Sequence, residues 1–415
     1  MNGKHHRRPD CRLCGSRDVQ LVLPLKPSAL ADSYLPADRK HESAERFPMD
    51  VYLCGACGHM QLLDVVNPEI LFSNYLYITS SSLGLVEHFR KYAEAVLAEL
   101  KPAPGSLVMD IGSNEGALLK FFQQSGMKVL GVDAAQNVAA LANKNGVETI
   151  ADFFSRDLAA KILKSHGSAK VITANNVFAH ADQLGGMLDG IHDLLAPDGV
   201  FVFEVVYLVD LVEKFTFDTV YHEHLSHHSV KPFQSFCARH DMELFHVERI
   251  PSKGGSIRGF VQRAGGPRPV NASVRDLVTL EERLGLDKPE AFRRYAALLD
   301  TRKAELLQML RGFKQQGKRI AGYGASASVT TLMHHFELGD LVEFIIDDNP
   351  ARQNLFSPGF HLPIVSSRAL TEQKPDYCVI LAWQYAAPII KNNAAYLAQG
   401  GRFIAPLPEV RIIES

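Results

Sequence analysis

Residues 219–228 read Thr-Val-Tyr-His-Glu-His-Leu-Ser-His-His, a segment that gathers one phenol, one carboxylate and four imidazoles. An imidazole titrates near neutral pH, a carboxylate can orient it, and a phenol can hydrogen-bond to an oxygen on which negative charge develops. The segment therefore indicates proton transfer, with Tyr221, Glu223 and His224 as candidates. Two other interpretations stay open from these residues alone. One is a metal site, although the His-Glu-x-x-His helix spacing is absent here, and the other is a solvated surface cluster.

Four of the six cysteines form two Cys-x-x-Cys-Gly pairs, Cys11 with Cys14 and Cys54 with Cys57. The tight turn of such a pair lets two thiolates bind one tetrahedral ion, and two pairs complete a zinc site. Because four thiolates leave no open coordination position, we expect the zinc to be structural. Paired disulfides are the alternative, which a reducing compartment disfavours.

The length of 415 residues predicts two or three domains rather than a single core. A formal net charge of −2 gives no electrostatic reason to bind nucleic acid or an anionic membrane. The most apolar run, residues 199–212, contains two acids and is shorter than the roughly 18 residues of a membrane span. The basic start leads into no apolar stretch, unlike a secretory signal. We therefore expect a cytoplasmic protein with no nucleic-acid and no membrane partner.

The elements that must position these residues alternate between strands and helices. Residues 106–111 form an apolar strand that leads into a loop with Gly112 and Gly116 and then into a helix. Glycines in such a loop let a ligand approach the backbone closely. The next strand ends in Asp133, 21 residues after Gly112, where an acid can hold the hydroxyl pair of a ribose. A helix cap or a solvated loop acid is the alternative for Asp133.

A second nucleotide-binding pattern follows in the last third of the chain. Residues 270–315 carry apolar residues at helical spacing and connect to it. Residues 318–326 predict a strand and a glycine-rich turn, and residues 342–350 predict a strand with acids at its end. The sequence thus predicts an α/β fold with a second Rossmann-like domain.

The Asp-x-Gly-x-x-x-Gly loop resembles that of class I S-adenosylmethionine-dependent methyltransferases, whereas nicotinamide dehydrogenases more often carry Gly-x-Gly-x-x-Gly. This resemblance implies S-adenosylmethionine as the cofactor, bound by residues at the ends of successive strands. The cofactor-binding residues it implies are Asp110, Gly112, Asn114, Gly116, Asp133 and Asn175, with Asp152 and Phe153 at the adenine.

A narrower resemblance covers nearly the whole chain. The zinc pairs, residues 75–77, the Asp110 loop, residues 175–180 and residues 221–226 resemble the three-domain sugar C-methyltransferases of bacterial deoxysugar biosynthesis. Enzymes of that family methylate carbon 3 of a nucleotide-linked 4-keto-6-deoxyhexose. A carbon beside a ketone becomes nucleophilic when a base removes its proton, so C-methylation needs an acid-base cluster.

The resemblance also implies a division of the chain into three domains. These are a zinc-binding domain at residues 1–66, a class I methyltransferase domain at residues 67–268, and a helical connector with a C-terminal Rossmann-like domain at residues 269–415. The last domain is expected to help hold the sugar nucleotide.

Within the family pattern, His224 aligns with the general base, and Glu223 and Tyr221 align with its neighbours. Tyr75 aligns with a tyrosine of the preceding segment, and His180 is expected to approach from the end of its strand. The implied reaction is proton abstraction by His224, stabilisation of the enolate by Tyr221 or Tyr75, and attack on the sulfonium methyl group.

Some positions depart from the family or allow two interpretations. Family members commonly carry tyrosines where His227 and His228 stand, so these histidines are predicted to shape substrate preference. Residues 253–258 resemble a Gly-Gly-Ser-x-Arg segment that contacts the sugar or diphosphate, with a hairpin turn as the alternative. Trp383 is interpreted either as a contact for the base or sugar or as packing.

The expected partner is a nucleotide-linked keto-deoxysugar, and the expected assembly is a monomer or a small homo-oligomer. Two other functions stay open. One is an O- or N-methyltransferase that acts on another small molecule, and the other is a nucleic-acid module built on the zinc ribbon. Neither the nucleotide nor the sugar follows from the sequence.

Overall fold

The computed structural model describes residues 3–72, 78–81 and 84–414. The chain forms two compact units, and each is described by itself. The first comprises Met1–Gln20, Leu53–Asp210 and Leu225–Lys288, and the second comprises Leu21–Tyr52, Leu211–His224 and Pro289–Ser415. Tyr75, a predicted catalytic residue, lies outside the described residues.

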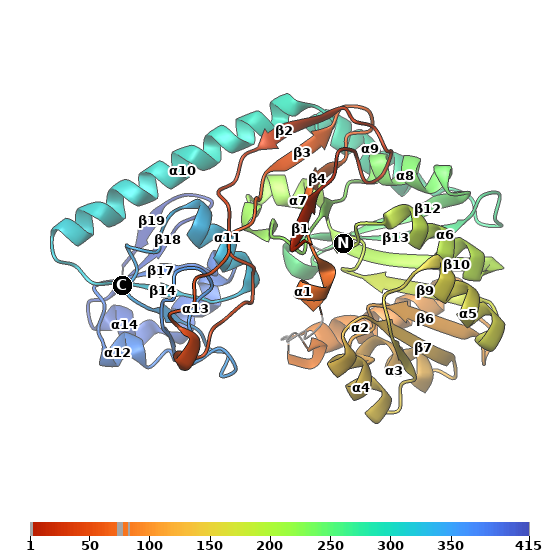
Figure 1. Ribbon diagram of the computed structural model, residues 1–415, viewed down its shortest axis with the longest axis horizontal. Coiled ribbons are helices and arrows are strands. Elements are labelled where there is room, and N and C mark those ends of the chain that lie inside the picture. The colour runs from red at the N-terminus through yellow and green to blue at the C-terminus, as the bar shows by residue number, and fades with distance from the viewer. Residues whose placement is uncertain (1–2, 73–77, 82–83, 415) are drawn as a thin grey trace. The chain divides into compact units, whose positions relative to one another are not determined.

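A seven-stranded sheet of order β12-β13-β10-β9-β6-β7-β8 forms the centre of the first unit. Figure 1 shows these strands as a row from β12 down to β7. The strands are β6 (Leu107–Ile111), β7 (Lys128–Asp133), β8 (Thr149–Ala151), β9 (Ala169–Asn175), β10 (Leu195–Val206), β12 (Met242–Ile250) and β13 (Ser256–Arg263). The first five are parallel, whereas β13 runs antiparallel to both β10 and β12. Every residue of β6 is buried, as expected for a parallel strand covered on both faces.

Helices connect the five parallel strands in alternation. They are α3 (Ala117–Gln124), α4 (Gln136–Lys144), α5 (Arg156–His166) and α6 (Leu184–Leu194). The unit also contains α2 (Leu85–Leu100) before β6, α8 (Val230–Arg239) before β12 and α9 (Ala272–Leu284) after β13. The apolar faces of α2 and α3 pack with strand residues in one core that includes Tyr92, Phe122 and Val171. The strand order reverses between β6 and β9, and such a switch point is where open α/β sheets bind ligands, at the carboxyl ends of the strands.

Short strands build the N-terminal part of the first unit. β1 (His5–Arg7) pairs with β5 (Asp64–Val66), and β4 (Met60–Leu62) pairs antiparallel with β11 (Ser226–His227). α1 (Pro68–Phe72) and a 3-10 turn η2 (Thr79–Ser81) follow. Three of the five boundaries between the two units fall inside β2 (Val19–Leu23), β3 (Val51–Cys54) and α7 (Leu208–Glu213), and the other two follow His224 and Lys288.

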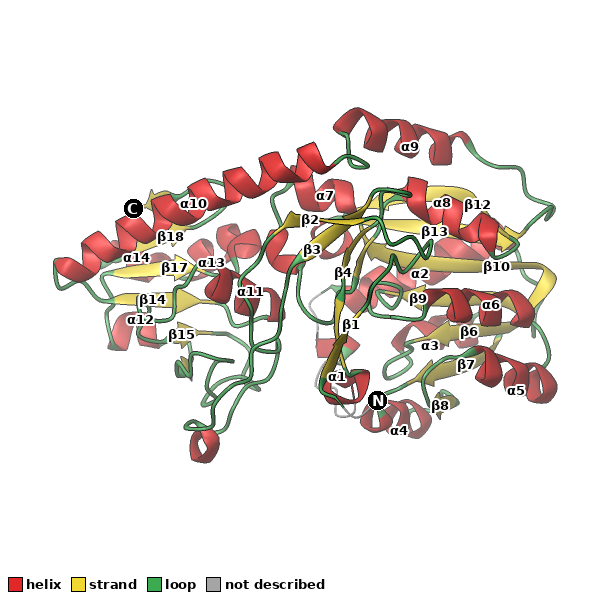
Figure 2. Cartoon of the chain, turned by 45° about the horizontal axis from the view of Figure 1, so that its top comes forward, coloured by secondary structure: helices red, strands yellow, loops and turns green. Residues whose placement is uncertain are grey.

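The second unit contains a six-stranded sheet of order β16-β15-β14-β17-β18-β19, which is the order of the Rossmann fold. Figure 2 shows β18, β17, β14 and β15 in this sequence. The strands are β14 (Ile320–Tyr323), β15 (Ile345–Ile346), β16 (Ile364–Val365), β17 (Tyr377–Ile380), β18 (Arg402–Ala405) and β19 (Arg411–Ile413). β19 alone in this sheet runs antiparallel to its neighbour.

A 27-residue helix, α10 (Pro289–Gln315), begins the C-terminal part of this unit. The other helical elements are η1 (Ala37–Arg39), η3 (Phe217–Thr219), α11 (Ala327–His335), α12 (Ala369–Glu372), η5 (Trp383–Tyr385), α13 (Ala386–Asn392) and α14 (Ala394–Ala398). The hydrophobic core of the second unit includes Tyr323, Ile346, Ile380 and Phe403. Among the described residues, no helix has the length and apolar character to span a membrane.

The predicted fold class is confirmed. The chain is α/β, with a methyltransferase-type sheet, a cysteine module at the N-terminus and a Rossmann-like sheet at the C-terminus. The exact three-domain boundaries stay a prediction.

Candidate active site and zinc centre

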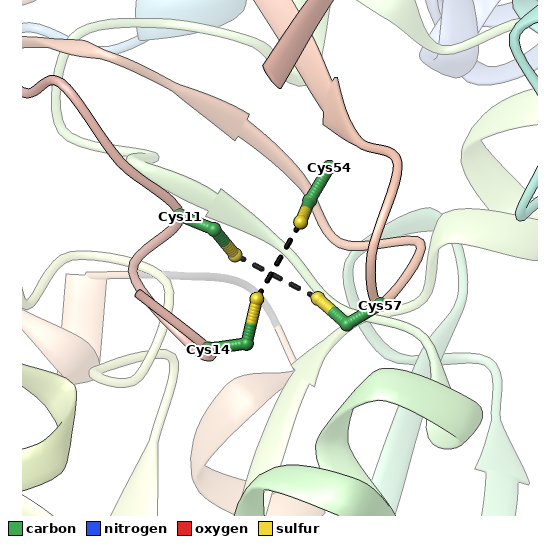
Figure 3. A group of neighbouring side chains, drawn as sticks. All are labelled: Cys11, Cys14, Cys54 and Cys57. Carbon is green, nitrogen blue, oxygen red and sulfur yellow. Dashed lines mark hydrogen bonds between the residues drawn. The ribbon is translucent and has the colours of Figure 1, made fainter. Parts of the chain in front are cut away.

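The four cysteines predicted to bind zinc converge on one point in the first unit (Figure 3). Cys11 Sγ lies 3.7 Å from Cys57 Sγ, and Cys14 Sγ lies 3.5 Å from Cys54 Sγ. All four sulfur atoms lie within 4.8 Å of one another. Zn–S bonds of about 2.3 Å require tetrahedral S–S edges of about 3.8 Å. The four thiolates therefore fit one tetrahedral zinc ion.

Both cysteine pairs fold through the same turn. Gly15 N donates to Cys11 O and Gly58 N donates to Cys54 O, each at 2.8 Å. Gly15 and Gly58 have φ of 70° and 79°, a conformation that side chains disfavour. The glycine that ends each Cys-x-x-Cys-Gly pattern thus closes the turn that directs both thiolates to one side.

The predicted cofactor loop joins β6 to α3 at the switch point of the first sheet. Gly112 has φ of 71°, and a Cβ there would lie 2.3 Å from Val177 Cγ2. Gly116 has φ of 79°, and a Cβ there would lie 2.8 Å from Val147 Cβ. Asn114, between them, also adopts a positive φ of 50°. Both glycine positions exclude a side chain, so neighbouring residues pack directly against the loop backbone; Gly112 is exposed, whereas residues 113–116 are buried.

Two acids lie at strand ends next to this loop, and one of them, Asp133, accepts a hydrogen bond from the loop backbone. Asp110, at the end of β6, is buried, and its Oδ1 accepts a 2.6 Å hydrogen bond from Thr173 Oγ1. Burial raises the pKa of Asp110 to about 7. Asp133 Oδ2 accepts from Asn114 N at 2.8 Å, and its Oδ1 accepts from Ala135 N at 2.9 Å. Asp133 therefore acts as a loop cap. Each of its oxygens has a second lone pair that can accept a hydrogen bond, so ribose binding stays a prediction.

Residues at the end of β8 suit an adenine ring. Asp152 N donates to Asp133 O at 3.0 Å, which places Asp152 and the following Phe153 next to the predicted ribose acid. Phe153 is 45% exposed, so part of its ring is accessible to a ligand. An exposed aromatic face at this position can stack on a base.

Asn175 ends β9 at the same edge of the sheet. Neither amide atom of Asn175 makes a hydrogen bond of good geometry within the described part of the chain, although both atoms are buried. The Tyr92 hydroxyl is a polar neighbour. A buried amide without satisfied atoms costs free energy unless a ligand supplies the partners. Asn175 and the glycine loop therefore fit the expected cofactor.

Arg258 lies in a strand and not in the loop that residues 253–258 were expected to form. The turn η4 (Ser252–Gly254) joins β12 to β13, so the hairpin interpretation holds there, and Arg258 lies within β13. Its Nε and Nη2 donate to Glu204 Oε1 at 2.8 and 2.6 Å, and its guanidinium lies 4.3 Å from the Tyr92 ring. His88 Nε2 contacts the other oxygen, Glu204 Oε2, at 2.8 Å. The buried guanidinium thus pairs with Glu204 inside the sheet, and a contact of residues 253–258 with the sugar or diphosphate stays a prediction.

Glu115 is a functional candidate that sequence reasoning missed. Its two carboxylate oxygens accept hydrogen bonds from Thr79 N at 3.1 Å and Ser80 N at 2.8 Å. Asn114 Oδ1 also accepts from Thr79 N, at 3.0 Å. The cofactor loop thereby fixes the chain four residues after Tyr75. No local pattern signals this contact, since any loop acid looks the same in the sequence.

His180 is half-buried and lies five residues after the end of β9. Its backbone N donates to Val177 O at 2.8 Å, and its ring lies 5.8 Å from the Phe72 ring. The first unit thus places His180 close to the chain that leads to residue 75.

The segment Leu211–His224 belongs to the second unit and contains Tyr221, Glu223 and His224. Tyr221 and His224 pack ring on ring, with centroids 4.0 Å apart. His224 Nδ1 lies 2.7 Å from Thr219 O. Because a carbonyl oxygen only accepts, Nδ1 carries the proton and the lone pair of the neutral ring is at Nε2. The Glu223 side chain is buried.

Contacts within the second unit hold this segment in place. Trp383 Nε1 donates to Asp218 Oδ2 at 3.1 Å, and Thr331 Oγ1 donates to Val220 O at 2.7 Å. His222 Nε2 donates to Phe47 O at 3.3 Å, and burial lowers the pKa of His222 to about 4. Trp383 is therefore a packing residue that orders the chain before His224, and His222 is a neutral structural group.

His227 and His228 lie in the first unit and are buried. His228 Nε2 donates to Phe178 O at 3.0 Å, and burial lowers the pKa of His228 to about 4. Its ring lies 5.5 Å from that of His59, the residue after the second cysteine turn. The role of His227 and His228 in substrate preference stays a prediction.

Three family models match successive parts of the chain. The "Putative zinc binding domain" matches residues 11–72, the "Methyltransferase domain" matches residues 86–247, and the "C-methyltransferase C-terminal domain" matches residues 251–408. The curated protein C-methyltransferase NovU of Streptomyces niveus is 35% identical over 407 residues, which cover 98% of this chain and 97% of that protein. The chain belongs to the three-domain C-methyltransferase family.

Solved structures resemble part of this C-methyltransferase. Magnesium protoporphyrin IX methyltransferase (ChlM) from Synechocystis PCC 6803 with bound SAH is 16% identical over 43% of this chain and 84% of that chain, with a TM-score of 0.34. An S-adenosylmethionine-dependent methyltransferase from Clostridium acetobutylicum ATCC 824 is 11% identical over 43% of this chain and 92% of that chain, with a TM-score of 0.36.

The membership confirms the predicted S-adenosylmethionine-dependent C-methyltransferase activity and the predicted cofactors, whereas the sugar substrate and the methylated carbon stay predictions. The C-methyltransferase uses S-adenosylmethionine and contains a structural zinc centre formed by its four N-terminal cysteines. The residue assignments around the cofactor and the base stay predictions, which the geometry of each unit supports.

Proposed function

We propose that this C-methyltransferase methylates carbon 3 of a nucleotide-linked 4-keto-6-deoxyhexose through a base-generated enolate. The observation that carries the proposal is the hydrogen bond between His224 Nδ1 and Thr219 O. It sets the tautomer in which Nε2 can accept a proton, which is what a general base at carbon requires.

His224 removes the proton from the carbon beside the ketone, and the electron pair of that C–H bond moves toward the carbonyl oxygen. Tyr221, which packs on the imidazole, donates a hydrogen bond to the enolate oxygen. The proton taken by His224 later leaves to solvent. Tyr75 is the other candidate for the enolate oxygen and lies outside the described residues.

S-adenosylmethionine supplies an electrophilic methyl group on a positively charged sulfur. Asp133 would hold the ribose hydroxyls, Phe153 the adenine, and Asn175 with the loop between Gly112 and Gly116 the methionine part. These residues lie at the carboxyl ends of adjacent strands in the first unit. Holding both reactants in one orientation contributes much of the rate in such transfers.

We also expect the second unit to hold part of the nucleotide. The side chains of Tyr34, Ser326, Thr330 and Ser357 gather beside the amino end of α11, where hydroxyl groups are able to hydrogen-bond to a phosphate or a sugar. The cavity between them has a volume of about 10 Å³, room for about one water molecule, so these side chains must move apart before part of a nucleotide binds there.

A product assay tests the proposal. The enzyme is incubated with S-adenosylmethionine and thymidine-, guanosine- and cytidine-linked 4-ketosugars, and products are analysed by mass spectrometry with carbon NMR. The proposal requires a product 14 mass units heavier, with the new methyl on the carbon beside the ketone. A methyl found on oxygen or nitrogen would replace it with the alternative transferase function.

A further inference from the structure

Arg12 lies inside the first cysteine turn, between Cys11 and Cys14. Its side chain contacts residues that are far from it in the sequence. Its side chain is fully buried. Nη1 donates to Leu62 O at 2.8 Å and to Leu225 O at 3.0 Å, and it also contacts Gln61 Oε1 at 3.1 Å. Leu225 is the residue that directly follows His224 in the chain.

The same carbonyl receives a second hydrogen bond. Leu62 N donates to Leu225 O at 3.0 Å, at the start of the β4–β11 pairing. β4 begins three residues after Cys57, so one short strand connects the zinc centre to Leu225. Arg12 and β4 together fix the backbone one peptide bond beyond the catalytic base.

An arginine suits this position better than other residues. Its planar guanidinium presents donors in a fixed fork, while Nε donates to Asp182 Oδ1 at 3.0 Å. Gln61 Oε1 also accepts from Arg12 N at 3.0 Å, which orients the amide toward the turn. Lysine has a single charged nitrogen and cannot reach Asp182, Leu62 and Leu225 from one rigid plane.

We propose that Arg12 is a positioning residue for His224: through Leu225 O it couples the zinc centre to the placement of the catalytic imidazole. The inference rests on the proposed role of His224 as the base. It gives the zinc module a part in the chemistry beyond stabilising the fold, through Arg12 rather than through the zinc ligands themselves.

Arg8 provides a matched control. It is also an arginine of the zinc module, and its Nη1 donates to the same Asp182 Oδ1 at 3.0 Å. The Arg8 side chain donates hydrogen bonds to Asp182 and Asp10, whereas the contact with Leu225 O comes from Arg12. R12K and R12M therefore remove the contact with Leu225, whereas R8K and R8M disturb the same ion pair without that contact.

Steady-state kinetics with the ketosugar that the enzyme methylates provides the first readout. We expect R12K to lower kcat about 10- to 100-fold and R12M to lower it further, with the KM for both substrates changed less than about threefold. Each R12 variant is expected to retain one zinc ion per chain. Values of kcat within twofold of wild type in R12M, or equal losses in R8M and R12M, would overturn the inference.

Hydrogen exchange provides a readout that needs no substrate. The Leu62 amide shares its acceptor with Arg12, so its protection against exchange is expected to fall about tenfold in R12M and to stay within twofold in R8M. Unchanged protection of Leu62 in R12M would contradict the coupling even if activity fell.

The failure of this inference is distinguishable from that of the proposed function. If H224N keeps wild-type turnover, then His224 is not the base and the proposed function fails. If H224N loses turnover while R12M keeps it, the base assignment stands and the positioning role of Arg12 is rejected.

Discussion

The imidazole of His224 is oriented by one backbone carbonyl. Thr219 O accepts the Nδ1 proton, and the Tyr221 ring packs against the imidazole. The sequence placed these residues within six positions of one another but could not give the tautomer, because the acceptor is a main-chain atom that every residue possesses. The chemistry of the base is thus decided by local backbone geometry.

Asn175, at the end of β9, gives a direct test of the predicted cofactor site. If its two buried amide atoms bind S-adenosylmethionine as predicted, N175A is expected to weaken binding about tenfold, as the loss of roughly 1.4 kcal/mol implies. Isothermal titration calorimetry with S-adenosylmethionine measures the Kd. The control is N145A, at the exposed end of α4, which should leave the Kd unchanged. Equal affinities in N175A and wild type would remove Asn175 from the cofactor site.

At the scale of elements, the segment that contains the predicted catalytic residues Tyr221, Glu223 and His224 has η3 as its regular structure. It is ordered by side chains from α11 and η5, which lie more than 100 residues later in the chain. Local patterns predict strands and helices, but they contain no information on which distant side chain meets which loop. Trp383 therefore allowed two interpretations in the sequence and only one in the structure.

Asp218 makes this ordering dependent on pH. Burial raises the pKa of Asp218 from 3.8 to about 7, so its folded-state pKa lies above the unfolded value. The associated stability is fully present below about pH 4 and is lost as pH rises to about 7. D218N carries no ionisable group there, so its stability relative to wild type should rise on the order of 2 kcal/mol between pH 5 and pH 8.

Thermal unfolding of both proteins at the two pH values measures this effect. The difference in Tm between D218N and wild type is expected to grow by roughly 4–8 °C from pH 5 to pH 8. A difference that stays constant across that range would show that Asp218 ionises normally in the folded protein.

The two Cys-x-x-Cys-Gly turns give a prediction for zinc binding. C57S removes one of four thiolates, so we expect the zinc content to fall from one ion per chain toward zero and unfolding of the first unit to begin at a lower temperature. Metal analysis after gel filtration measures the zinc content. C237A, which replaces a buried cysteine far from the centre, should keep one zinc ion. Full zinc content in C57S would contradict a four-cysteine site.

For the whole molecule, the sequence predicted the architecture because its signals are local. Both cysteine turns end in glycine, both glycine-rich loops follow an apolar strand, and Asp133 ends the next strand as expected. The contacts that were missed join residues far apart: Arg12 to Leu225, Glu115 to Thr79, and Arg258 to Glu204. Each needs the folded topology to bring its partners together.

For the whole molecule, the central proposal is that His224 forms an enolate in an S-adenosylmethionine-dependent enzyme. Exchange of the substrate's carbon 3 proton with solvent tests this proposal most directly. The ketosugar substrate is incubated in D2O with enzyme and S-adenosylhomocysteine, so that no methyl transfer occurs, and deuterium at carbon 3 is measured by NMR. Wild type is expected to incorporate deuterium, and H224N to do so at least about 100-fold more slowly. Equal rates of incorporation by wild type and H224N, or none by a wild type that still methylates this carbon, would contradict the account.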